Sequence, residues 1–367
     1  MTTTAARPTI VGALRDRVME FAERLTTPLV PSDYLDVIDP LRSGTALRGR
    51  IVAVNAETRD AVTVVIKAGR GWRAHVPGQY VRVGVDVDGV RQWRAYSLTS
   101  ETGRRDGCIA ITVKAIPDGV VSNYLVRKAT AGTLLHLDQA TGEFTLGAQP
   151  PVKILFITAG SGITPVMGML RNLADLDTDI DIDIVVVHSA PTAADVIFGD
   201  ELRLLARQGR IRLVERHTDF DGMLDVARLD DIVDDIADRQ TWACGPVGLL
   251  DAVERRWAAD GLADHLHTER FRPSVQVTGD GGTVTFTKTG TVVDAANSET
   301  LLDAGETAGV LMPSGCRMGI CFGCVAPLRQ GSVRDLRTGD VITAAEGDGI
   351  QIQTCISAAA SDCHIDL

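Results

Sequence analysis

Hydrophobic and polar positions alternate in two different ways along this chain. In the first half, short β-branched runs with intervening polar residues are separated by glycine turns, a pattern that predicts antiparallel strands. Six such runs occur between Leu47 and Leu146: residues 47–54, 61–69, 80–89, 91–99, 108–116 and 133–139. Strands at this spacing indicate a barrel or a sandwich.

After Pro150 and Pro151 the pattern changes to continuous apolar runs that alternate with amphipathic stretches. The apolar runs predict strands at 152–160, 181–190, 211–217 and 239–245, and the amphipathic stretches predict helices at 164–176, 200–208, 226–238 and 248–261. Strands that alternate with helices in this way are typical of βαβ units and of a parallel sheet covered on both faces.

The two ends of the chain follow other patterns. Residues 9–25 place apolar side chains at helical spacing between charges of both signs, which predicts one amphipathic helix. Its mixed charges favour packing against the protein over contact with a membrane surface. After residue 274 we expect a hairpin, a helix, a cysteine-rich loop and a second hairpin. The chain therefore divides into an extension (1–44) and three domains (45–150, 151–271 and 274–367).

Composition narrows the classes of function. The 367 residues are 45% hydrophobic and 23% charged, as in globular proteins. The net charge of −11 argues against a nucleic-acid partner. No apolar run is long enough for a membrane span, and the first residues lack the features of a signal peptide. We therefore expect a cytoplasmic location, where thiols stay reduced and clustered cysteines indicate metal or redox chemistry.

Four of the seven cysteines form a pattern. Cys316, Cys321 and Cys324 are spaced C-x4-C-x2-C, and Cys355 follows one hairpin later, which is the spacing of plant-type two-iron, two-sulfur ferredoxins. Structural zinc is the main alternative, but it usually uses paired C-x2-C units and only one is present here. The other cysteines, Cys108, Cys244 and Cys363, are expected to be structural.

Two loops of the predicted parallel sheet are candidates for nucleotide binding. In the stretch from Gly160 to Pro165, an apolar strand runs through a glycine turn into a helix, whose N–H groups suit a pyrophosphate. It is not the G-x-G-x-x-G fingerprint, and a simple tight connection is the alternative. Cys244, Gly245 and Pro246 follow the fourth strand, at the edge where such sheets bind ligands. The alternative role for Cys244 is that of a small buried hydrophobe.

The predicted barrel carries a second set of candidates. Arg94 and Tyr96 alternate on one strand and so face the same side, which places a cation for a phosphate beside an aromatic plate. Ser97 faces the other side in an ideal strand, so it can join Arg94 and Tyr96 in one site only if the strand bends locally. The stretch from Gly119 to Ser122 begins a predicted helix, a second site where an anion can bind.

Together these motifs resemble one family, the ferredoxin-NADP reductase-like flavoproteins with a C-terminal plant-type [2Fe-2S] ferredoxin domain. The resemblance covers residues 45–367 and rests on PGQYV (77–81), RAYS (94–97), GVVS (119–122), TAGSGITP (158–165), ACGP (243–246) and the four cysteines. It implies a multidomain fold with an antiparallel β-barrel flavin domain, an α/β parallel-sheet NAD(P) domain and an α+β (β-grasp) ferredoxin domain.

The resemblance also implies roles for single residues. Arg94 would contact flavin phosphate, Tyr96 would pack on the isoalloxazine and Ser97 would lie near flavin N5. Further roles follow for the flavin pyrophosphate (Gly119, Val120, Ser122), for the nicotinamide nucleotide (Gly160, Gly162, Thr164, Cys244, Gly245, Pro246) and for the cluster (Cys316, Cys321, Cys324, Cys355). Tyr96, Ser97 and Cys244 would form the catalytic set, and Phe271 would approach the flavin.

The activity that the resemblance implies is that of an NAD(P)H oxidoreductase. Electrons would pass from NADPH through FAD and the [2Fe-2S] cluster to a partner; a sister group uses FMN, and NADH is the alternative donor. The strand at 181–190 ends in His188, Ser189 and Ala190, where NAD-specific folds place an acid that binds a ribose hydroxyl, and the lack of an acid there favours NADPH. Ser189 is then the candidate contact for the 2′-phosphate, although an arginine often found just after it is absent here.

The partner implied by the resemblance is an oxygen-activating iron enzyme. The N-terminal extension is most similar to that of actinobacterial reductases that serve membrane acyl-CoA (stearoyl) desaturases, which would bring the protein to the inner face of the membrane. Alkane hydroxylases, ring-hydroxylating oxygenases and oxygen itself are alternative acceptors, and a non-catalytic zinc module is an alternative of another class. From Ser274 onward eleven acidic and five basic residues predict a basic acceptor and salt-sensitive transfer.

Overall fold

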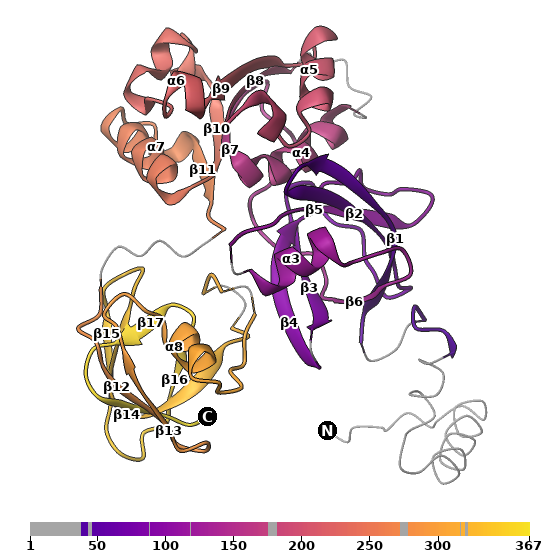
Figure 1. Cartoon of the computed structure of the whole chain (residues 1–367). Coiled ribbons are helices and arrows are strands. Elements are labelled where there is room, and N and C mark those ends of the chain that lie inside the picture. Colours follow the sequence, from indigo (N-terminus) through magenta and orange to yellow (C-terminus); the bar gives the residue numbers. More distant parts are fainter. Residues whose placement is uncertain are drawn as a thin grey trace, which may run out of the picture.

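The computed structural model describes residues 38–42, 46–87, 89–117, 119–174, 182–271, 278–315, 317–319 and 322–367. The predicted helix at 9–25 lies outside the described residues, as do Cys316 and Cys321. Three sheets organise the described part of the chain, and each forms a separate body in Figure 1.

The first sheet is antiparallel and has the strand order β4-β3-β6-β1-β2-β5. Past the end of β4, Leu98 bridges Ile111 of β5, which brings the two edges together. Aliphatic side chains on alternate positions, such as Val64 and Val81, are fully buried inside. The predicted antiparallel barrel is confirmed. Its elements are β1 (Arg48–Thr58), β2 (Ala61–Ala68), β3 (Tyr80–Val87), β4 (Val90–Ser97), β5 (Cys108–Lys114), α3 (Val120–Arg127) and β6 (Leu134–Leu137).

The second sheet is parallel, with the order β11-β10-β7-β8-β9. Side chains of β7 alternate between two cores: Phe156 packs in the cluster that includes helix α4, and Ile157 in the cluster that includes helix α7. Helices therefore cover both faces, as predicted. The elements are β7 (Lys153–Ala159), η1 (Gly160–Gly162), α4 (Ile163–Ala174), β8 (Asp183–Ala190), η2 (Ala193–Asp195), α5 (Gly199–Arg207), β9 (Arg212–His217), α6 (Thr218–Asp221), β10 (Gln240–Cys244), α7 (Val247–Ala259), η5 (Ala263–His265) and β11 (Leu266–Glu269).

The helix predicted at 226–238 is wrong. The structure has two short 3-10 segments there, η3 (Val226–Asp231) and η4 (Ile236–Asp238). Asp225 accepts a hydrogen bond from the Ala227 N–H, and Arg228 has non-helical backbone angles. Aspartates compete with a helix because their side chains bond to nearby backbone groups. No helix of the described residues is long and apolar enough to cross a membrane.

The third sheet is mixed, with the order β13-β12-β18-β14-β15, and both β16 and β17 pair with β14. Helix α8 packs its buried Leu301 and Ala304 into the same core as Phe286, which gives the expected α+β architecture. The elements are β12 (Gly282–Phe286), β13 (Thr291–Ala295), α8 (Leu301–Thr307), β14 (Val325–Asp335), β15 (Val341–Ala344), β16 (Ile350–Gln353), β17 (Ser357–Ala359) and β18 (Cys363–Ile365).

The first and second bodies share a close interface. Gly168 of α4 lies so near the barrel that a β-carbon there would come within 2.3 Å of the Leu98 carbonyl oxygen. Trp242 of β10 donates its indole N–H to the Thr145 carbonyl at 3.3 Å. Backbone contact without room for a side chain fixes the barrel against the parallel sheet, and a cavity lies where they meet.

Candidate functional site

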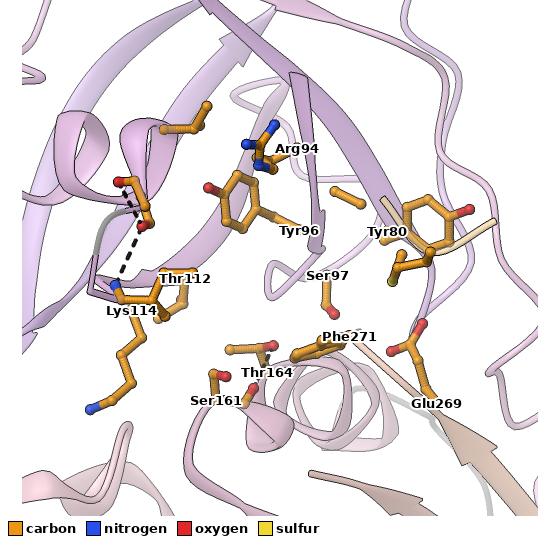
Figure 2. A pocket seen from close by; sticks show the side chains of 16 residues that line it. Tyr80, Arg94, Tyr96, Ser97, Thr112, Lys114, Ser161, Thr164, Glu269 and Phe271 are labelled. Atoms are coloured by element: carbon orange, nitrogen blue, oxygen red, sulfur yellow. Dashed lines mark hydrogen bonds between the residues drawn. The ribbon is translucent and has the colours of Figure 1, made fainter. Parts of the chain in front are cut away.

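A cavity of about 200 Å³ lies where the three bodies meet. Figure 2 shows side chains from the barrel above it and from the β7–α4 turn and the end of β11 below it. Met318, from the cysteine-rich loop, also lines it. The lining residues are Tyr80, Arg94, Ala95, Tyr96, Ser97, Thr112, Lys114, Ile116, Gly119, Val121, Ser122, Ser161, Thr164, Glu269, Phe271 and Met318.

Arg94 and Tyr96 lie on β4 and both face this cavity, as their alternation predicted. Burial and the neighbouring Arg317 cation lower the pKa of Arg94, while burial raises the pKa of Tyr96 above its usual range. Among the described residues no carboxylate forms an ion pair with Arg94, whose Nη1 donates instead to the Trp93 carbonyl at 2.7 Å. The Glu306 and Asp303 carboxylates act on Arg94 without direct contact, so its guanidinium keeps donors that suit an anionic ligand such as a phosphate.

Ser97 also lines the cavity, although an ideal strand would point it away. β4 ends at this residue, so the strict alternation of side chains no longer applies. Ser97 is 3% exposed, and within the described part of the chain its Oγ has no hydrogen-bond partner. A buried hydroxyl left unpaired inside a cavity is expected where a ligand supplies the partner.

Glu269, which the sequence analysis missed, faces Ser97 across the cavity (Figure 2). Its Oε2 is buried and likewise lacks a partner among the described residues. Burial raises the pKa of Glu269 to about 8, so the carboxyl is mostly neutral at pH 7. Its position in the sequence could have marked it, because it is an acid at the carboxyl end of a parallel strand and lies two residues before Phe271. Phe271 lines the cavity too, and its contact with a flavin stays a prediction.

The turn before α3 is held by Gly119 and Ser122. A β-carbon on Gly119 would lie 2.4 Å from Ser122 Oγ, so any larger residue would displace the Ser122 side chain. Ser122 Oγ donates to the Gly119 carbonyl at 3.2 Å and accepts from the Ile116 N–H at 3.4 Å. Both residues line the cavity, whereas the half-exposed Val120 side chain does not. The backbone N–H groups that open the helix can thus receive an anion.

The β7–α4 turn lies on the opposite side. Gly160 has φ +54°, and a β-carbon on Gly162 would come within 2.0 Å of the Cys244 carbonyl oxygen, so this turn packs directly on the end of β10. Thr164 lines the cavity and donates its hydroxyl to the Ser161 carbonyl at 2.9 Å. The turn therefore exposes backbone N–H groups at the entrance of α4, where a pyrophosphate binds well.

Cys244 is completely buried in the apolar core and is not among the residues that line the cavity. Burial, together with the Glu269 carboxyl, raises the pKa of its thiol well above the usual value. The thiol therefore stays protonated, and its contact with a nicotinamide stays a prediction. Next to it, Gly245 packs against Ala159 and Leu249, and Pro246 begins α7.

Ser189 lies at the end of β8 and pairs in register with Arg216 of β9, so the two side chains share one face of the sheet. Ser189 is 5% exposed, and its Oγ has no partner within the described ranges. Arg216 donates one N–H to the Asp221 carbonyl at 3.1 Å. The arginine that was absent from the sequence after Ser189 thus has a candidate replacement on the neighbouring strand.

Strand pairing places Cys324 beside Thr354, the residue that precedes Cys355. Val325 pairs with Gln353 in the β14–β16 ladder, and the Cys324 carbonyl accepts hydrogen bonds from Thr354 Oγ1 at 3.0 Å and from the Thr354 N–H at 3.3 Å. Both cysteines are buried, at 1% and 3% exposure. Buried thiols on two adjacent chain segments are the donor chemistry that an iron–sulfur cluster requires.

The loop between the cysteines is tightly fitted. Gly319 has φ +75°, and a β-carbon there would come within 2.9 Å of Ile356. Its carbonyl accepts a hydrogen bond from Gln353 Nε2 at 3.0 Å. Arg317 forms ion pairs with Asp303, at 3.0 Å, and with Glu306 of α8. These contacts fix the loop so that Met318 reaches the cavity between the sheets.

Three family models match the chain, in the order expected for its three bodies. Residues 61–146 match an oxidoreductase FAD-binding domain, residues 156–255 an oxidoreductase NAD-binding domain and residues 284–360 a 2Fe-2S iron-sulfur cluster binding domain. The expected FAD and the iron–sulfur interpretation of the cysteine pattern are thereby confirmed over FMN and zinc.

Relatives extend over nearly the whole chain. A Mycobacterium tuberculosis protein named NADPH oxidoreductase is 47% identical over 98% of this chain and 96% of its own. The glycine betaine monooxygenase reductase subunit of Chromohalobacter salexigens is 30% identical over 83% of this chain and 91% of its own. The structure of phthalate dioxygenase reductase shares the fold, with a TM-score of 0.60 and 21% identity over 88% of this chain and 98% of that one.

Proposed function

This chain belongs to the family of oxygenase reductases that join FAD-binding, NAD-binding and [2Fe-2S] domains in one oxidoreductase, and we propose that it carries electrons from NADPH to an oxygen-activating iron enzyme. The observation that carries the proposal is the shared cavity: Tyr96 of the barrel, Thr164 of the parallel sheet and Met318 of the cysteine-rich loop all line it. The predicted domain limits, 45–150, 151–271 and 274–367 with an extension at 1–44, are part of the proposal.

When bound, the flavin and the cluster convert the two electrons of a hydride into single electrons. The residues of the chain hold these groups in place. Arg94 neutralises flavin phosphate, Tyr96 supports the ring system, and the turn of Gly119 and Ser122 binds the pyrophosphate. Cys316, Cys321, Cys324 and Cys355 supply the four thiolates of the cluster.

Ser97 and Glu269 set the polarity around the reacting ring. Glu269 keeps its proton at neutral pH, so the cavity holds a hydrogen-bond donor there rather than a negative charge. Ser97 is buried and Glu269 is half-buried by accessible surface, so both groups lie mostly away from bulk water. Figure 2 shows Phe271 beside Thr164, on the side of the cavity where a nicotinamide bound at the β7–α4 turn would enter it.

The preference for NADPH rests on the end of β8. Ser189 offers a hydroxyl that is unpaired among the described residues, and Arg216 on the neighbouring strand offers a cation to a 2′-phosphate. Glu215, the acid on the neighbouring position, faces the other side of the sheet and is already paired with Arg203 at 2.7 Å. Burial alone would raise the pKa of Glu215, but hydrogen bonds from Arg203 and His217 lower it overall. Its charge is therefore neutralised locally and does not repel the phosphate.

A membrane acyl-CoA desaturase is the first candidate acceptor. We propose it from the resemblance of the sequence, with its N-terminal extension, to reductases that serve such enzymes, and from the acidic third domain, which suits an acceptor with a basic face. A ring-hydroxylating or related oxygenase is the second candidate. That alternative is supported by the named relative that is a monooxygenase reductase subunit.

Two measurements test these proposals. Anaerobic titration should reduce the flavin and the cluster with NADPH at lower concentrations than with NADH; lack of bleaching by either nucleotide would contradict the reductase activity. The reduced protein is then mixed with membranes that contain an acyl-CoA desaturase, or with a ring-hydroxylating oxygenase. The acceptor class is the one that forms more product with the reduced protein than in air without it. Added salt should lower this rate of product formation. Equal rates without either partner would instead indicate oxygen as the acceptor.

A further inference from the structure

The cysteine-rich loop exposes an aromatic side chain. Phe322, between Cys321 and Cys324, is 67% exposed, although large apolar side chains are normally buried. Its φ of +54° lies in the left-handed region that favours glycine. A glycine would relieve the backbone and a polar residue would relieve the exposure. Phe322 does neither, so the ring is costly for the isolated protein.

The other non-glycine residues with positive φ make contacts that offset their backbone strain. Among the described residues only Phe198, Arg317 and Phe322 are non-glycines with positive φ. Phe198 is buried in the core of the parallel sheet, at 4% exposure. Arg317 is held by its ion pairs to Asp303 and Glu306. Phe322 has no comparable burial, and such unrelieved strain is characteristic of functional surfaces.

Met318 and Phe322 divide the loop into two sides. Met318 lines the cavity together with Tyr80 and Arg94, so that side already faces the flavin domain. Phe322 is not among the cavity residues and projects into solvent. A second protein can therefore approach the cluster cysteines at Phe322 without displacing the flavin domain.

The charge around the third domain indicates the chemistry of that protein. In the described residues from 278 to 367, every basic side chain is engaged by a carboxylate of the same segment: Lys288, Arg317, Arg329, Arg334 and Arg337. Exposed carboxylates without such partners include Asp294, Glu346 and Asp348. The surface is thus acidic with an aromatic projection, which complements a cationic protein with an apolar recess.

We propose that Phe322 is the docking anchor for the electron acceptor, and that the acceptor is a cationic protein whose redox centre lies beside an apolar recess. This inference rests on the proposed function as a reductase, and it adds the residue and the face through which electrons leave. Buried aromatic anchors ringed by charge are typical of the few interface residues that dominate binding.

A cationic cytochrome c serves as the probe, because it accepts one electron at an apolar haem edge surrounded by basic residues. One NADPH and two ferric cytochromes give NADP⁺, one proton and two ferrous cytochromes. Phe322→Gly keeps the backbone angle and removes the ring, Phe322→Leu retains apolar bulk, and Val292→Ser removes another exposed apolar side chain (60% exposed, on β13) of the same domain. Ferricyanide, a small anion, reports electron flow that does not require docking.

Phe322→Gly should raise the KM for cytochrome c about tenfold, as for loss of a central aromatic anchor, while Phe322→Leu should lie between it and the wild type. Ferricyanide reduction and cluster absorbance should stay unchanged, and Val292→Ser should match the wild type. An unchanged KM in Phe322→Gly, an equal rise in Val292→Ser or loss of the cluster in Phe322→Gly would overturn the proposal. If the wild type reduces cytochrome c but supports no oxygenase or desaturase, the proposed function fails and the docking result still stands.

Discussion

Ser97 and Glu269 face the same cavity from two different sheets, and each presents a buried oxygen that has no hydrogen-bond partner among the described residues. Most buried polar groups in a folded protein are hydrogen-bonded. The bound flavin and nicotinamide are the groups expected to pair with them, which makes this pair the most sensitive place to probe the site.

Replacing Glu269 by Gln should change the pH dependence of the reaction. In the wild type, the rate of flavin reduction by NADPH should fall as the pH rises through about 8, because the carboxyl then becomes charged inside the cavity. Glu269→Gln should abolish this fall and keep the rate at pH 7 within a few-fold. Stopped-flow measurements between pH 6 and about pH 9.5 test this, with exposed Glu346→Gln as the control that retains the fall.

The same substitution should affect stability in a defined direction. The pKa of Glu269 is raised from 4.5 to about 8, so between these values the unfolded chain binds fewer protons than the folded one. The free energy of unfolding therefore falls as the pH rises through this range. Glu269→Gln should remove that decline and melt at a higher temperature than the wild type at pH 8.5 or so. A wild-type decline that persists in the variant would assign it to another group.

Gly162→Ala should destabilise the parallel-sheet domain. Its β-carbon would lie 2.0 Å from the Cys244 carbonyl oxygen, and backbone on both sides cannot easily move. We expect a loss of about 2 kcal/mol in the free energy of unfolding, as for overpacked cores. Gly248→Ala is the matched control, because nothing lies within 4 Å of its β-carbon in helix α7. Thermal or urea unfolding compares the two, and equal stability would show that the turn can relax.

Ser189→Ala and Arg216→Ala should weaken the reaction with NADPH and spare the reaction with NADH. Loss of the arginine should lower kcat/KM for NADPH by at least about tenfold, since a charge-assisted bond to a phosphate is lost. Ferricyanide reduction with both nucleotides measures the ratio. Arg207→Ala, an exposed arginine on α5, should leave it unchanged. An equal loss of kcat/KM with NADH would instead indicate that the substitution distorts the parallel sheet.

Cys355→Ser should remove the cluster without removing the flavin. The variant should lose iron and the brown cluster absorbance, remain yellow and still reduce ferricyanide with NADPH. Transfer to protein acceptors should drop to background, because single electrons no longer reach the third domain. Cys108→Ser on β5 should keep iron, flavin and acceptor activity, and retention of full iron in Cys355→Ser would exclude this residue as a ligand.

Much of this architecture could be predicted from the sequence because the patterns are local. The strand rhythm of the barrel, the βαβ alternation and the C-x4-C-x2-C spacing each depend on neighbours along the chain. Arg94 and Tyr96 were placed together by simple alternation on β4, and the structure has them so. Ser97 required knowledge of where that strand ends.

The residues that were missed depend on contacts between distant elements. Glu269 becomes part of the cavity only because β11 ends beside the barrel, and Arg216 approaches Ser189 only through the β8–β9 register. No motif marks either residue. The helix wrongly predicted at 226–238 failed for a different reason: its apolar spacing was right, but its many aspartates favour local turns.

The hydrogen bonds from Thr354 to the Cys324 carbonyl have a consequence for how the cluster is acquired. The first three cysteines of the pattern lie within nine residues, but the segment that carries the fourth comes to lie beside Cys324 only when β16 pairs with β14. Until that pairing forms, the loop supplies only three of the four thiolates that the cluster needs. Assembly of the complete cluster therefore depends on the pairing of β16, and the folding of the third domain sets when the protein becomes able to transfer electrons.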